Sequence, residues 1–144
     1  MKYLVLLGRI LYSWMFIPTA IAHFSAPTIG YAASAGVPAP SILVPLSGII
    51  ASLGGLSILL GFKARIGAWL IVLFLVPVTL MMHNWWTVAD PAARQMQHIM
   101  FHKNLAMLGA ALLIIYFGAG PCSIDNMRTK KSDNGPWPES LPKK

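Results

Sequence analysis

The chain has 144 residues, of which 56% are hydrophobic and only 10% are charged, with a formal net charge of +7. A soluble globular domain carries about 25% charged residues, so this composition excludes an ordinary soluble protein and indicates one that lies in a lipid bilayer. Because Cys122 is the only cysteine, an internal disulfide and a dithiol redox pair are excluded as well.

Four segments are apolar and long enough to cross a hydrocarbon core of about 30 Å, which takes roughly 20 residues of helix. They are Tyr3–Phe24, Ser41–Phe62, Arg65–His83 and about Ile99–Gly118. Each is predicted to be helical, because lipid offers the backbone no other hydrogen-bond partner. The predicted fold class is therefore all-α, an integral membrane four-helix bundle over residues 1–125. Residues 126–144 are polar and basic, and we expect a disordered cytoplasmic tail there.

The first segment begins like a signal peptide, with Lys2 ahead of an apolar run and a small-residue triplet at Ala20-Ile21-Ala22. Because Arg9 interrupts that run, we expect the segment to remain as the first spanning helix. A charge near the centre of a spanning helix costs about 2.5–3.5 kcal/mol, which makes Arg9 a candidate ligand contact. Arg9 is also close enough to the start of the helix to reach the lipid headgroups or form a structural hydrogen bond. Both interpretations stay open.

The loop between the first two spans predicts a short helix over about Thr28–Ala35 at the outer interface, because Gly36 suits a helix end. The second span then repeats small residues at Ser47, Ala51 and Gly55. That spacing lets another helix approach closely. We expect it to serve packing inside the bundle in preference to a dimer seam, since the chain has helices of its own to pack.

Most of the positive charges lie near the two termini and in the link between the second and third spans. With four spans, these segments are all on the same side of the membrane. The charged residues are Lys2, Lys63, Arg65, Arg128, Lys130, Lys131, Lys143 and Lys144. The loop over residues 25–40 carries no charge. Because cytoplasmic loops carry the excess of Lys and Arg, both termini and the link between the second and third spans are predicted to be cytoplasmic.

The fourth span has a polar beginning. Asp90 followed by Pro91 is typical of a helix start, so the helix is predicted to begin near Pro91, ahead of its apolar part. Its early turns carry four residues that a spanning helix normally lacks, namely His98, His102, Lys103 and Asn104.

The predicted topology places all four histidines at the outer face, because His23 ends the first span, His83 ends the third, and His98 and His102 begin the fourth. His98 and His102 are four residues apart and share one side of the helix. Neutral imidazoles bind zinc, copper and iron. A metal site is therefore one hypothesis, with His98 and His102 as ligands and His23 or His83 completing the shell.

A quinone or similar redox ligand is the second hypothesis for this layer, because quinone carbonyls accept hydrogen bonds from His, Lys or Asn. The candidate contacts are His98, His102, Lys103 and Asn104, with Arg9 as a further candidate. A structural alternative explains the same residues: imidazole rings suit the interface, Lys103 extends outward to the headgroups, and Asn104 bonds a neighbouring helix. No catalytic residue is assigned.

Five segments in order along the chain resemble the DoxX family of small bacterial membrane proteins: "GRILYSWMFIPTAIAHF", "GVPAP", "LGGLSILLGFKARIGAWL", "HKNLAMLGAALLI" and "GPCSID". Arg9, Gly54-Gly55, Arg65 and Lys103-Asn104 carry most of the resemblance. It implies a four-helix bundle in the bacterial inner membrane, associated with oxidoreductases. The chain departs from the family pattern at residues 51–53, Ala-Ser-Leu, where many relatives carry a glutamate before the double glycine.

Three functions follow as hypotheses. The first, which the resemblance connects to redox chemistry, is a non-catalytic subunit or scaffold of a membrane redox complex, because the usual constellation of an active site is missing. The alternative is an oxidoreductase component that binds a quinone or a transition metal at the outer face. The third is a small transporter or lipid-handling protein, which the lack of internal repeats disfavours. The expected partners are the lipid bilayer and a protein subunit or second copy, with no nucleic acid.

Overall fold

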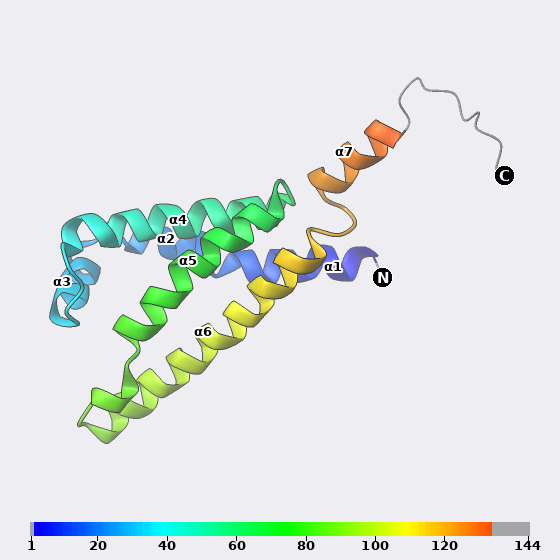
Figure 1. The fold of residues 1–144 in the computed structure, drawn as a ribbon. Coiled ribbons are helices and arrows are strands. Elements are labelled where there is room, and N and C mark those ends of the chain that lie inside the picture. The colour runs from blue at the N-terminus through cyan, green and yellow to red at the C-terminus, as the bar shows by residue number, and fades with distance from the viewer. Residues whose placement is uncertain (1, 134–144) are drawn as a thin grey trace, which may run out of the picture.

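A computed structural model describes residues 2–133, which form helices joined by short loops with no strand among them (Figure 1). In chain order the elements are α1 (Lys2–Trp14), α2 (Phe16–Ala22), α3 (Ala26–Ser34), α4 (Pro40–Leu60), α5 (Ala64–Met82), the 3-10 turn η1 (Trp85–Thr87), α6 (Pro91–Phe117) and α7 (Ile124–Asp133).

The described residues contain four spans that are long and apolar enough to cross a membrane: Tyr3–Ala22, Pro40–Leu60, Ala64–Thr87 and Pro91–Phe117. The protein is therefore an all-α integral membrane helical bundle, as predicted. The first span differs in one respect, because it is broken at Met15 into α1 and α2. Pro18 accounts for the break, since its nitrogen has no hydrogen to donate to the carbonyl of Trp14.

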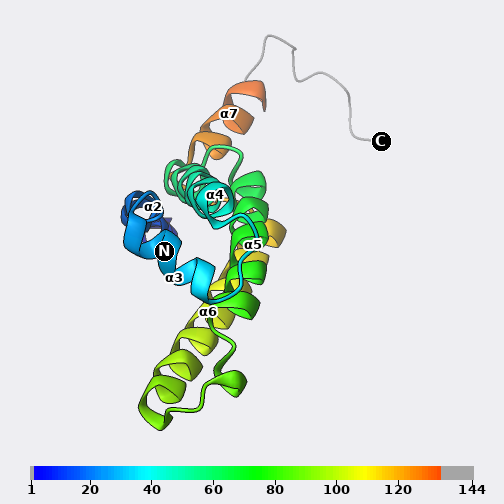
Figure 2. The same ribbon diagram turned by 90° about the vertical axis from the view of Figure 1, so that its left-hand side faces the viewer.

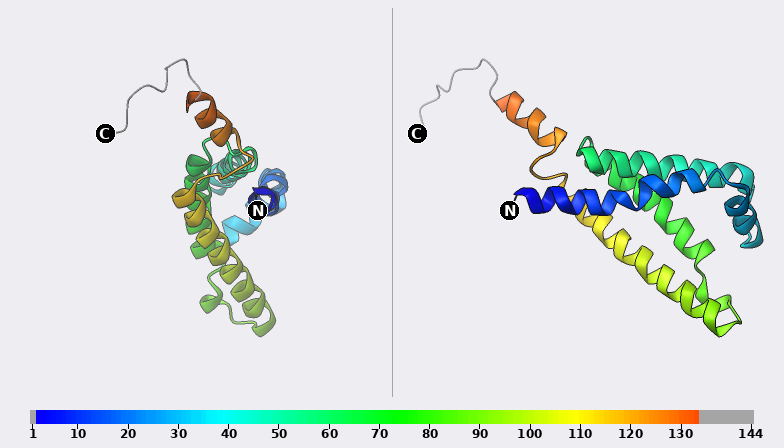
Figure 3. Two further views of the ribbon diagram at one scale, coloured as in Figure 1. Left: turned by 90° about the vertical axis from the view of Figure 1, so that its right-hand side faces the viewer. Right: turned by 180° about the vertical axis from the view of Figure 1, so that it is seen from behind.

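The spans pack in sequence, with α1 and α2 against α4, α4 against α5, and α5 against α6. The chain starts and leaves the bundle at one end, which carries Lys63 and Arg65 and which we call the basic end. The opposite end carries His23 and His83 and is called the histidine end. Figure 3 shows that α1 and α6 approach each other toward the basic end, whereas α2 and α6 diverge toward the histidine end.

The core is built around α4, which packs against helices on two sides. Ala51 is fully buried, and a Cβ added at Gly55 would lie 3.0 Å from the Cβ of Phe16. On the other side, a Cβ added at Gly54 would lie 2.8 Å from the carbonyl oxygen of Gly67 on α5. These contacts show that Ala51 and Gly55 of the predicted small-residue repeat pack inside the bundle, whereas Ser47, the third member, is only partly buried.

Two predicted helix starts are present. The Asp90 side chain accepts a hydrogen bond from the backbone N–H of Ala93 at 2.7 Å, so α6 begins at Pro91 as the Asp-Pro pair predicts. The short helix predicted over about Thr28–Ala35 forms as α3, which starts two residues and ends one residue earlier than predicted. The predicted basic tail begins inside α7, which runs over Ile124–Asp133, and residues 134–144 lie outside the described residues.

Candidate functional site

The histidine end contains a partly open cavity of about 460 Å³ that is lined by residues of α2, α3, α4, α5 and α6. Figure 2 views this end of the molecule, with α3 lying across it. Most of the cavity wall is apolar and includes Phe16, Ala32, Val44, Phe74, Val78 and Met107. The cavity exists because α2 and α6 diverge here, so that side chains of the intervening helices face a space that no helix fills.

The divergence starts from a fixed point lower in the bundle, where Tyr12 on α1 donates a hydrogen bond to the carbonyl of Met107 on α6 at 3.0 Å. The ring of Tyr12 packs on Phe16, which in turn meets the edge of Phe74. Phe16, Phe74 and Met107 all line the cavity. This aromatic layer therefore forms the end of the cavity that points toward the basic end.

Lys103 and Asn104, two of the candidate ligand contacts, both line the cavity. The Lys103 ammonium donates to the thioether sulfur of Met100 at 3.2 Å, which is a weak acceptor. Asn104 is only 5% exposed. Within the described part of the chain, the amide of Asn104 makes no hydrogen bond and the ammonium of Lys103 has no carboxylate partner. Two polar groups are thus left available at one place on the cavity wall.

The histidines divide into two pairs. His23 and His83 line the cavity, whereas His98 and His102 do not. Nδ1 of His23 donates to the carbonyl of Thr19 at 2.7 Å, and its ring meets that of Phe74 with centroids 5.7 Å apart. The first pair is therefore part of the cavity wall and already has hydrogen-bond partners.

His98 and His102 lie on an exposed face of α6 with their ring centroids 4.2 Å apart, so the predicted shared face is confirmed. Nδ1 of His102 donates to the carbonyl of His98 at 2.9 Å, and His98 packs edge-on against Trp85. The structure does not assemble the predicted shell in which His23 or His83 joins them. Among residues 2–133, no group of three or more His, Cys, Asp or Glu side chains could hold a metal ion.

Arg9 lies at the basic end, away from the cavity, and is 4% exposed. Its guanidinium donates to the carbonyl of Ala119 at 3.1 Å and to the carbonyl of Cys122. Both carbonyls follow the end of α6, where backbone oxygens lack helical partners. Of the two interpretations of Arg9, the structure places it in a structural hydrogen bond and does not bring it near Lys103 and Asn104.

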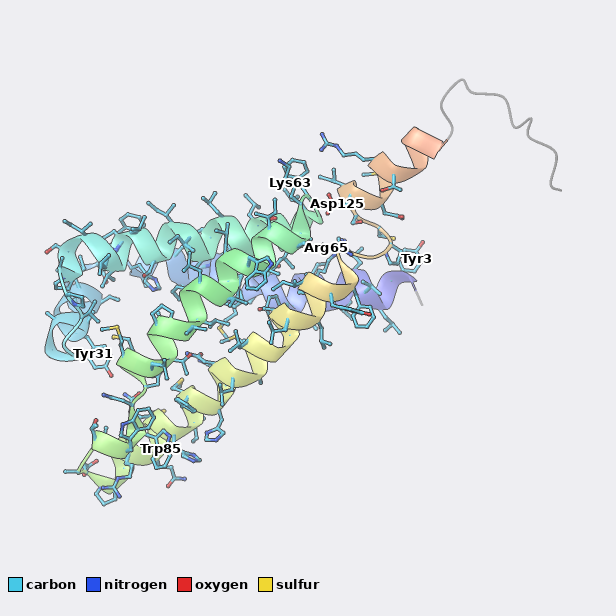
Figure 4. The ribbon with its side chains drawn as sticks, in the orientation of Figure 1. Tyr3, Tyr31, Lys63, Arg65, Trp85 and Asp125 are labelled. Atoms are coloured by element: carbon cyan, nitrogen blue, oxygen red, sulfur yellow. The ribbon has the colours of Figure 1, made fainter. Side chains whose placement is uncertain are left out.

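A second connection at the basic end was not predicted from the sequence. The carboxylate of Asp125 accepts hydrogen bonds from the backbone N–H groups of Lys63 at 2.8 Å and Ala64 at 3.1 Å, which caps the start of α5 (Figure 4). The N–H of Asp125 donates to the carbonyl of Gly61 at 2.9 Å. In the sequence, Asp125 is distinguished only as an acidic residue in a basic segment. Its role as a cap could not be predicted, because its partners are about sixty residues away.

A pair of hydrogen bonds, which was also not predicted, connects α3, α6 and the end of α5 beside the cavity. Nδ1 of His83 donates to the amide oxygen of Gln97 at 2.7 Å, and the amide nitrogen of Gln97 donates to the hydroxyl of Tyr31 at 2.8 Å. Figure 4 shows Tyr31 on the side of α3 that faces α5 and α6. Since Ala32 of α3 lines the cavity, this hydrogen-bonded bridge connects the part of the cavity wall formed by α3 to His83 and Gln97.

Replacing Gln97 with leucine removes both bonds of this bridge. We expect a loss of about 1–2 kcal/mol of stability, since each hydrogen bond contributes about 0.5–1.5 kcal/mol. Amide hydrogen exchange in α3, over Ala26–Ser34, should accelerate. The matched control is Gln95→Leu on the same helix, at an exposed position. Unchanged exchange in α3 of the Gln97 variant would show that the bridge does not hold this helix.

Comparison with known proteins identifies the family of the chain. The SURF4 family matches residues 1–132. The chain is 33% identical to the Escherichia coli inner membrane protein YqjF over 129 residues, covering 88% of this chain and 93% of the relative. It is 30% identical to the Escherichia coli inner membrane protein YphA over 98 residues, covering 68% and 69% of the two chains.

A eukaryotic relative matches as well. The chain is 26% identical over 132 residues to the Surfeit locus protein 4 homolog of Drosophila melanogaster, covering 90% of this chain and 42% of that protein. No solved structure matches. These findings overturn the resemblance to the DoxX family, which was wrong. The motifs behind it consist of small, apolar and basic residues at helix ends, which recur in membrane bundles for reasons of packing and topology.

Proposed function

The chain belongs to the SURF4 family as a multi-pass protein of the inner membrane, and we propose that it is a binding protein without chemistry of its own, which takes an amphipathic ligand into the cavity at its histidine end. The observation that carries the proposal is the combination of an apolar cavity with the available polar groups of Lys103 and Asn104. Ligand sites typically have this composition, an apolar wall with a few polar groups that fix orientation.

The cavity has the size and the access that such a ligand needs. Its volume of about 460 Å³ falls in the range of ligand pockets, about 300–1,000 Å³. Its rim includes apolar side chains that are 40–58% exposed, namely Met15, Leu43, Leu46 and Leu73. In a membrane these side chains face hydrocarbon. An apolar chain can therefore pass from the bilayer into the cavity without crossing a polar barrier.

The residues around the cavity favour binding over catalysis. No Asp, Glu or Cys is among the described residues that line it. The hydroxyls of Thr19 and Ser47, which line the cavity, donate to backbone carbonyls of their own helices. Within the described residues no hydrogen bond joins one of these hydroxyls to His23 or His83, so no nucleophile is paired with a base there. The expected connection to a redox complex came from the DoxX resemblance, and without that family it has no support.

The test is photo-crosslinking in a lipid nanodisc with a zwitterionic phosphatidylcholine that carries a diazirine in one acyl chain. We expect mass spectrometry to map adducts to cavity residues such as Phe74 and Met107. Ser47→Phe places a ring in the cavity and should abolish these adducts. The control, Leu53→Phe, adds a ring to the same helix at an exposed position and should leave them unchanged.

Two outcomes would contradict the proposal. Adducts confined to the exposed lipid-facing residues of α4 and α5, with none in the cavity, would show that no chain enters. Equal cavity labelling in the Ser47→Phe variant and the wild type would show that the label reaches Phe74 and Met107 from another direction. A folded Ser47→Phe variant, verified by its helical circular dichroism, is required for the comparison.

A further inference from the structure

Lys103 lies deep in the membrane for a charged residue. It precedes Phe117, the last residue of α6, by 14 positions, which is about 21 Å along the helix at about 1.5 Å per residue. With Phe117 placed at the edge of a hydrocarbon core of about 30 Å on the side of the basic end, the backbone of Lys103 lies within the core, in the part toward the histidine end. An ionisable residue at this depth is costly and is by default a candidate for function.

The described chain supplies no counter-charge for Lys103. The sequence contains four acidic residues in all: Asp90, Asp125, Asp133 and Glu139. Asp90 caps the start of α6, 13 positions before Lys103, and Asp125 caps α5 at the basic end. Asp133 ends α7, beyond the basic end, and Glu139 lies outside the described residues. Within residues 2–133 the ammonium of Lys103 forms one hydrogen bond, to the Met100 sulfur, which carries no charge.

Asn104 provides a second and independent observation at the same place. Its side chain is 95% buried, lines the cavity and has no hydrogen-bond partner within residues 2–133. The amide is not among the fully buried polar atoms of the described residues, so a ligand in the cavity can reach it, and polar groups this far withdrawn from water are normally hydrogen-bonded. An anionic oxygen placed between the Lys103 ammonium and the Asn104 amide nitrogen would satisfy both.

The polar groups, and not the apolar wall, must decide which lipid binds. Lipid tails are as apolar as the cavity, so a chain gains little by leaving the bilayer for the cavity. Selectivity therefore comes from the headgroup. Because the exposed apolar rim opens to hydrocarbon, the source of the ligand is the bilayer.

We propose that the ligand is an anionic membrane phospholipid, whose phosphate pairs with Lys103 and accepts a hydrogen bond from Asn104 while one acyl chain occupies the cavity. This inference rests on the proposed function, and it adds the chemical class of the ligand. Binding is reversible and forms no covalent bond. The second acyl chain remains in the bilayer at the rim formed by Met15 and Leu73.

Competition against the photoactivatable phosphatidylcholine tests the headgroup. Cavity labelling of the wild type is measured while unlabelled phosphatidylglycerol or unlabelled phosphatidylcholine is added to the nanodisc in equal amounts. We expect phosphatidylglycerol to compete about fivefold more effectively, because the choline group of phosphatidylcholine adds a positive charge that Lys103 repels, whereas phosphatidylglycerol has none. Lys103→Met keeps the length of the side chain and should abolish this preference, whereas Lys103→Arg should retain it. The matched control is Lys63→Met at the basic end, which should behave as wild type.

The outcomes separate this inference from the proposed function. Cavity labelling with equal competition by the two phospholipids in the wild type would overturn the anionic headgroup and leave the proposed function standing. Absence of cavity labelling would overturn the proposed function itself. If free palmitate displaces the label and phosphatidylglycerol does not, the ligand is a free acid and the phospholipid assignment is wrong. If Lys103→Met does not fold, the wild-type competition and the Lys103→Arg variant still decide the question.

Discussion

The Arg9→Leu variant is expected to be about 2–4 kcal/mol less stable than the wild type, because it loses two charge-assisted hydrogen bonds, each contributing about 1.5–3 kcal/mol, while the cost of burying the guanidinium, which leucine does not carry, offsets part of that loss. The carbonyls of Ala119 and Cys122 would lose their donors near the end of α6, where Arg9 is 4% exposed. The measurement is the midpoint of thermal unfolding in a mild detergent. It should fall by several degrees, since about 1 kcal/mol shifts the midpoint of a protein of this size by roughly 3–5 °C.

Arg128→Leu is the matched control for Arg9→Leu. Arg128 is exposed on α7 and lies over the ring of Phe62, so its removal should change the midpoint little. Arg9→Lys gives a second check, because a lysine keeps the charge but cannot reach two carbonyls with a planar fork. The unfolding midpoint of Arg9→Lys should lie between those of the wild type and Arg9→Leu. A midpoint unchanged by Arg9→Leu would show that the guanidinium does not join α1 to the segment after α6.

The Gly67→Ala variant has the second large expected effect, a loss of about 1–3 kcal/mol from overpacking. A Cβ at this position would lie 2.4 Å from the hydroxyl oxygen of Ser57 and 2.9 Å from the carbonyl of Gly54. The serine hydroxyl could rotate away, but the carbonyl belongs to the backbone of α4. Alanine at Gly67 therefore forces α4 and α5 apart, and the unfolding midpoint in detergent should decrease.

Gly109→Ala provides the control for Gly67→Ala, since it makes the same change inside another spanning helix. A Cβ at Gly109 meets no atom within 4 Å, and alanine has the higher helix propensity. We expect a stability equal to or slightly above that of the wild type. Equal destabilisation by the two variants would assign the effect to loss of glycine itself, and the close approach of α4 and α5 would then not limit stability.

The sequence identified the two polar residues of the candidate site, but it did not decide which histidines belong to the site. Lys103 and Asn104 could be identified because polar residues in a spanning helix require an explanation. The metal-site hypothesis grouped all four histidines because the predicted topology places them at the same depth in the membrane. Depth in the membrane does not decide which side of a helix faces a cavity. His23 and His83 line the cavity, whereas His98 and His102 lie on an exposed face.

The sequence by itself determined the class of the protein, the number of its spans and the start of α6 at Asp90-Pro91. These features depend on local quantities, namely the hydropathy of about 20 consecutive residues and the chemistry of a helix cap. Only the tertiary structure decided that Arg9 binds the carbonyls after α6, that Asp125 caps α5, and that α2 and α6 diverge around a cavity. Each of these depends on the rotation and crossing of helices that are far apart in the chain, which packing sets and local sequence does not record.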